Sequence, residues 1–168
     1  EGTRLSDLGD SATSFLTYVL SFVYLGIYWN NHHHMFQLVR RIDGLVLWAN
    51  LHLLFWLSLY PFTTRWIDET DLARTPLVVY GVNLLAAAIA YYLLQLAIFR
   101  AEGAYGLLRQ AVGTDLKGKV SPLLYVLGIA SAFVSTWLAV AFFVLVALIW
   151  LVPDRRMESF VAEHGLED

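Results

Sequence analysis

The chain has 168 residues, of which 58% are apolar and 15% are charged, and its mean hydropathy is +0.59. An average soluble domain has roughly 45–50% apolar and about 25% charged residues, so this composition excludes an ordinary soluble domain and indicates a membrane protein. The net charge of −3 gives no sign of nucleic-acid binding, and the lack of cysteine excludes disulfides, thiolate nucleophiles and thiolate metal sites.

Five apolar segments follow one another along the chain, separated by short charged joints. They cover residues 14–34, 45–66, 76–99, 120–134 and 136–152, each to within a few positions. A bilayer core about 30 Å thick is crossed by roughly 17–25 helical residues, so we expect five membrane spans. None of the segments alternates with period two. The predicted fold class is therefore all-α, a transmembrane helix bundle that forms a single domain over residues 1–168.

The last two segments form one long apolar run, which we divide near residues 133–137 because Ser135 and Thr136 favour a turn there. Orientation is predicted from the basic residues. The joints at 35–44 and 100–119 together contain six Lys or Arg and three Asp or Glu, whereas the joint between them is acidic overall. By the positive-inside rule, the two basic joints and the tail at 153–168 are cytoplasmic.

This orientation places the polar residues 1–13 outside, although the chain opens at Glu1 with no apolar segment before it. We therefore expect one further helix ahead of them in the intact protein, which would give six spans. The expected location is the plasma membrane of a prokaryote, with the C-terminus in the cytoplasm.

Two polar clusters face each other across the first basic joint. Asn31 and the three following histidines lie at the cytoplasmic end of the first span, and Trp48, Asn50 and His52 begin the second. Successive helical residues turn by about 100°, so three adjacent histidines cannot all face one partner. One interpretation is an interfacial cap that wets the helix end. The other is an inter-helix hydrogen-bond network, because amides and imidazoles inside a membrane need partners.

A third interpretation is a cofactor site. In a b-type haem protein, His33 or His34 and His52 could serve as axial ligands on neighbouring helices. A non-conducting membrane scaffold is a further alternative, and ion flux would distinguish it from a channel. We expect no bound cofactor, no catalytic residues and no enzyme activity.

The stretches "SFVYLGIYWNNHHHMF" and "LWANLHLLFWLSLYPFTTRWI" resemble the second and third helices of the transmembrane protein 175 family, the lysosomal and bacterial potassium channels. The resemblance rests on the spacing of Tyr28, Trp29, Asn31, His32 and His33, and of Trp48, Asn50 and the Pro61–Phe62 pair. The later segments are similar to the family in length and order.

The family's first helix lines the pore and contains an Arg followed closely by Phe-Ser-Asp. "RLSDLGD" near the start of this chain has a different spacing, so the pore-lining residues are expected on a helix that is absent here. The resemblance implies a supporting role around that helix for five residues. They are Asn31, His32, His33, Trp48 and Asn50.

What the resemblance implies is passive, potassium-selective conduction by a homotetramer in a lipid bilayer. Proton permeation is associated with the lysosomal relatives. The sequence has no "TVGYG" carbonyl filter, so a hydrophobic constriction is the expected selectivity element.

Overall fold

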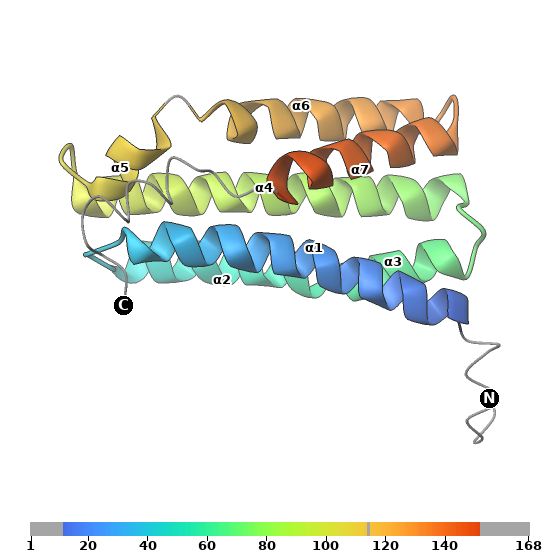
Figure 1. The fold of residues 1–168 in the computed structure, drawn as a ribbon, viewed down its shortest axis with the longest axis horizontal. Helices are drawn as coiled ribbons and strands as arrows, with labels where there is room; N and C mark the ends of the chain where they lie inside the picture. The colour runs from blue at the N-terminus through green and yellow to red at the C-terminus, as the bar shows by residue number, and fades with distance from the viewer. Residues whose placement is uncertain (1–11, 114, 152–168) are drawn as a thin grey trace, which may run out of the picture.

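The computed structural model describes residues 12–113 and 115–151, and this part of the chain is an all-α bundle, which confirms the predicted fold class. Its long helices run side by side along one axis (Figure 1). The helices are α1 (Ala12–Gln37), α2 (Gly44–Ser58), α3 (Tyr60–Asp68), α4 (Arg74–Glu102), α5 (Leu107–Val112), α6 (Leu116–Ser131) and α7 (Thr136–Leu151).

Two helical stretches in the described part are long and apolar enough to cross a membrane, Gly44–Asp68 and Arg74–Glu102, and α7 is a shorter apolar helix. The fourth and fifth apolar segments are separated by a turn at residues 132–135, in the region where the sequence was divided. The predicted cytoplasmic tail at 153–168 lies outside the described residues.

The helix boundaries have identifiable local causes. Asp43 caps α2, because its carboxylate accepts a hydrogen bond from the Val46 N–H at 3.0 Å. Pro61 has no N–H to continue the hydrogen-bonding of α2, and it lies in the first turn of α3, where none is required. Gly103 ends α4 with φ 76°, a left-handed conformation that glycine adopts without strain.

Helix α4 is the central helix of the bundle and packs against α2, α3, α6 and α7. Glycines allow α4, α6 and α7 to approach closely. A Cβ atom on Gly81 would lie 2.6 Å from the Phe143 ring, and one on Gly128 would lie 2.5 Å from the same ring. Small residues at helix contacts are typical of membrane bundles, where packing rather than the hydrophobic effect holds helices together.

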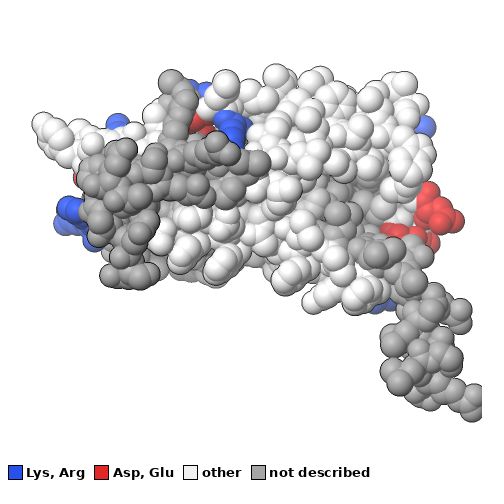
Figure 2. Space-filling model, viewed as in Figure 1, with Lys and Arg blue, Asp and Glu red and all other residues white. Residues whose placement is uncertain are grey.

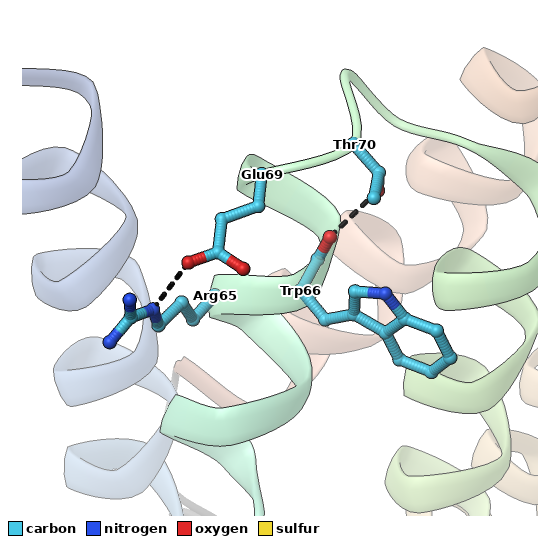
Figure 3. A network of polar contacts seen from close by, with 4 residues as sticks. All are labelled: Arg65, Trp66, Glu69 and Thr70. Atoms are coloured by element: carbon cyan, nitrogen blue, oxygen red, sulfur yellow. Dashed lines mark hydrogen bonds and ion pairs between the residues drawn. The ribbon is translucent and has the colours of Figure 1, made fainter.

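On the face that Figure 2 shows, charged side chains lie towards the two ends of the bundle, and much of the area between them is uncharged. At the end formed by the α3–α4 joint, Arg65 pairs with Glu69 at 2.7 Å, and the Thr70 hydroxyl donates to the Trp66 carbonyl oxygen at 2.7 Å (Figure 3). The C-terminus of α1, the start of α2 and helix α5 lie at the opposite end (Figure 1). The predicted polar clusters therefore lie towards the α5 end.

Candidate functional site: the polar end of helix α1

Asn31 joins three helices inside the bundle. Its side chain is 7% exposed, and its Nδ2 donates to the carbonyl oxygens of Ile27 at 2.8 Å and of Trp150 in α7 at 3.2 Å. The Tyr91 hydroxyl of α4 donates to the backbone oxygen of Asn31 at 3.2 Å. Trp150 lies in the last turn of α7, where carbonyl oxygens lack intrahelical partners, so Asn31 satisfies a group that would otherwise be unpaired.

His32 links α1 to α2. Its Nε2 lies 2.7 Å from Oδ1 of Asn50, and the ring also lies 4.5 Å from the Phe36 ring. A carboxamide oxygen only accepts hydrogen bonds, so this pairing requires the proton of a neutral His32 to be on Nε2. The structure thus brings together two of the five predicted site residues in one bond.

His33 and Trp48 do not join this network within the described chain. Both side chains are exposed, Trp48 by 72%. His33 stacks on Trp29 with ring centroids 5.4 Å apart and nearly parallel planes. His34 contacts its own helix, with Nδ1 3.2 Å from Oε1 of Gln37. The three adjacent histidines therefore have three different environments, as the 100° helical turn requires.

An internal cavity adjoins Asn31. It lies between α1, α4, α6 and α7 and is lined by residues that include Tyr28, Gln95, Tyr125 and Trp150. The centres of water molecules can occupy about 50 Å³ of this cavity. This is room for roughly three or four waters. The Gln95 side chain is 3% exposed and makes no hydrogen bond to the described residues, so its amide can hydrogen-bond to water in this cavity.

Sequence reasoning did not find the roles of Tyr91, Trp150 and Gln95. Gln95 carries a sequence signal, since an amide in an apolar helix needs a partner, but the sequence does not show whether that partner is a neighbouring helix or a cavity. Asn83, the other amide buried in α4, has its partner on a neighbouring helix, because its Nδ2 donates to Oγ1 of Thr63 in α3 at 3.3 Å. The Trp150 and Tyr91 contacts depend on tertiary packing and have no local sequence signal.

The existing contacts of the histidine side chains bear on whether they could bind a haem iron. Nε2 of His52 accepts a hydrogen bond from Nε1 of Trp56 at 2.9 Å, so iron binding at that nitrogen would have to displace the indole. Among the described residues, no group of three or more His, Cys, Asp or Glu side chains could hold a metal ion. The geometry favours hydrogen bonding by these histidines over metal ligation.

The apolar helices and the hydrogen-bond network of amides and an imidazole at one end of the bundle indicate a helical membrane protein. Comparison with known proteins then identifies its family. Residues 1–61 match the family model described as endosomal/lysosomal potassium channel TMEM175. The chain is 48% identical over 164 residues to a protein of a Chryseobacterium species named potassium channel, an alignment that covers 98% of this chain and 85% of that protein.

Two further bacterial proteins named potassium channel are also similar. The one from Streptomyces collinus is 30% identical over 148 residues, which is 84% of this chain and 72% of that protein. The one from Chamaesiphon minutus is 32% identical over 133 residues, which is 76% of this chain and 66% of that protein. No solved structure matches. The chain belongs to the TMEM175 family and is an integral membrane protein, which confirms the family predicted from the sequence.

Proposed function

We propose that this protein is a subunit of a channel that conducts potassium passively and in preference to sodium. The observation that carries the proposal is the 48% identity to the Chryseobacterium potassium channel over 98% of this chain. The chemistry of the described residues is compatible with it. The buried polar side chains of the described helices are all serine, threonine, asparagine or glutamine.

Ion conduction is proposed to occur between subunits of a homotetramer. Interlocked aromatic rings fill the centre of one subunit, with Tyr24, Tyr60 and Tyr80 within 6.4 Å of one another by ring centroid. A packed centre of this kind argues against a path for ions through the described part of a single subunit. The pore would therefore lie where several subunits meet.

The predicted site residues would support this pore in two ways. Asn31 and the His32–Asn50 pair hold the polar end of α1 against α7, α4 and α2. The exposed side chains of His33 and Trp48 are proposed to contact the pore-forming part of the assembly. They would act as supports for that part of the protein and not as ion ligands.

The proposed location is the prokaryotic plasma membrane, with residues 35–44, 100–119 and 153–168 in the cytoplasm. Gln37 is the last residue of α1 and Thr70 lies in the joint between α3 and α4. The C-terminal end of α1 and this joint lie at opposite ends of the bundle (Figure 1). The chain has no cysteine, so single cysteines at these positions can be labelled without background. A membrane-impermeant maleimide applied to intact cells should label Thr70→Cys and spare Gln37→Cys. Equal labelling of both from outside would contradict this orientation.

The function is tested by reconstituting the purified full-length protein into liposomes. We expect tetramers by native mass spectrometry and potassium efflux that exceeds sodium efflux under equal gradients. A pH-sensitive dye in the same vesicles tests whether protons also pass. Stable tetramers without potassium flux would favour the scaffold alternative, and an intense Soret band in the purified protein would favour the haem alternative.

A further inference from the structure

Four exposed arginines lie at the α5 end of the bundle, on three separate elements. We call Arg40, Arg41, Arg100 and Arg109 the arginine corner. Arg40 and Arg41 lie in the joint between α1 and α2, Arg100 lies in the last turn of α4, and Arg109 lies in α5. All four side chains are exposed. Figure 2 shows basic side chains gathered at this end.

Two contacts hold these elements together. The backbone N–H of Arg40 donates to Oε1 of Glu102 at 2.6 Å, which fixes the α1–α2 joint against the end of α4. The Arg109 guanidinium lies over the Phe99 ring, 5.0 Å from its centroid, which positions α5 on the same helix end. The arginine corner is thus a feature of the tertiary structure, although its members are as many as 69 positions apart in the sequence.

Three described carboxylates near this end accept hydrogen bonds from backbone N–H groups. Asp43 accepts from the Val46 N–H, Asp115 accepts from the Gly118 N–H, and Glu102 accepts from the Arg40 N–H. None of the four arginines makes an ion pair with a carboxylate among the described residues. The situation at the opposite end differs, since Arg65 there pairs with Glu69. The arginine corner therefore presents guanidinium groups that form no ion pair within the described part of the chain.

We infer that the arginine corner binds the phosphate headgroup of an anionic phospholipid. Guanidinium groups match phosphate oxygens with paired hydrogen bonds, and basic clusters at the membrane boundary attract anionic lipids. The surroundings favour a lipid over a free anion, because exposed apolar side chains continue directly from Arg41. Ile42 is 53% exposed and Leu45 is 48% exposed, so acyl chains can lie against them while the headgroup meets the arginines.

The test measures thermal unfolding of the purified full-length protein in detergent with added lipid. Phosphatidylglycerol is compared with phosphatidylcholine of the same acyl chains, and inorganic phosphate is a third arm. The variant is Arg41→Gln with Arg100→Gln, because these two side chains are exposed and make no hydrogen bond, ion pair or ring contact with the described residues. The matched control is Arg65→Gln with Arg74→Gln, which removes the same charge at the opposite end.

Phosphatidylglycerol should raise the unfolding midpoint of the parent and the control by about 3 °C or more above phosphatidylcholine. The arginine-corner variant should lose at least half of that difference. The inference is overturned if the variant keeps the full shift, if the control loses it equally, or if inorganic phosphate alone reproduces it. Should either double variant fold poorly, direct counting of bound phosphatidylglycerol by native mass spectrometry on the single variants Arg41→Gln and Arg65→Gln gives the same comparison.

Discussion

The two faces of α1 differ sharply in what they contact. The inward face includes Tyr24, Asn31 and Met35, which are buried and follow one another at intervals of seven and four residues, as positions on one side of a helix do. The Tyr24 hydroxyl also donates a hydrogen bond to the Phe143 carbonyl oxygen of α7 at 2.8 Å. The outward face includes Trp29, which is 66% exposed, and His33, whose ring stacks on it.

This difference teaches that one polar motif serves two purposes. Asn31 and His33 are only two positions apart, yet the first closes hydrogen bonds inside the subunit and the second projects from it. Residues of the inward face should therefore determine the stability of the subunit. Residues of the outward face should affect assembly and conduction with little effect on subunit stability.

The largest effect is expected at Asn31. Asn31→Ala removes both bonds of its amide and leaves the Trp150 carbonyl oxygen unpaired, which should cost about 1–2 kcal/mol of unfolding free energy. Asn30→Ala is the matched control, because the neighbouring amide makes no hydrogen bond to the described residues. Thermal unfolding in detergent measures both. Equal losses for the two variants would remove the distinction between the faces.

A smaller effect is expected at Tyr91. Tyr91→Phe removes the bond from its hydroxyl to the Asn31 backbone oxygen and should cost about 0.5–1 kcal/mol. Tyr92→Phe is the control, since it also removes one hydroxyl group from a tyrosine, but from a side chain that is 44% exposed. The same unfolding assay measures both variants. A greater loss of unfolding free energy for Tyr92→Phe than for Tyr91→Phe would contradict the hydrogen bond assigned to Tyr91.

The bond between His32 and Asn50 should contribute about 0.6 kcal/mol, the average for side-chain hydrogen bonds between membrane helices. A double-mutant cycle with His32→Ala and Asn50→Ala measures this coupling free energy directly. A parallel cycle with His33→Ala and Asn50→Ala should give no coupling. Coupling of His33 rather than His32 to Asn50 would mean that α1 is rotated by about one residue.

Much of the fold was predictable from the sequence, because long apolar runs predict helices and the acidic or basic joints mark their ends. The turn at 132–135 was signalled by Ser135 and Thr136. The rotation of α1 was not predictable. The helix is apolar on nearly all sides, so hydrophobic periodicity does not indicate an inward face. The rotation of α1 is fixed by Tyr24, which packs edge-on against Tyr60 and Tyr80. These contacts exist only in the folded bundle.

The same reasoning explains the predicted site. A pair of polar clusters at one depth indicated a network, and the His32–Asn50 bond lies at that depth. Which of three adjacent imidazoles reaches α2 depends on the rotation of α1, so the sequence did not distinguish His32 from His33. The partners of Asn31 are 60 and 119 positions away, beyond the reach of any local pattern.

The smallest effects on stability are expected for the outward histidines. His33→Ala and His34→Ala should each change the unfolding free energy by less than about 0.5 kcal/mol, as exposed substitutions usually do. Their effects on tetramer formation should differ, because His33 projects from α1 whereas His34 contacts Gln37 of its own helix. Native mass spectrometry should show fewer tetramers for His33→Ala, and a larger loss for His34→Ala would contradict this assignment.

Potassium flux through liposomes containing equal amounts of folded His33→Ala and parent protein tests the central claim most directly, because it measures function in a variant whose subunit fold should be intact. We expect His33→Ala to alter the flux while its unfolding midpoint stays that of the parent. An unchanged flux with an unchanged midpoint would contradict a functional role for the outward face of α1. The histidines would then be only a hydrated interfacial cap at the end of a membrane helix.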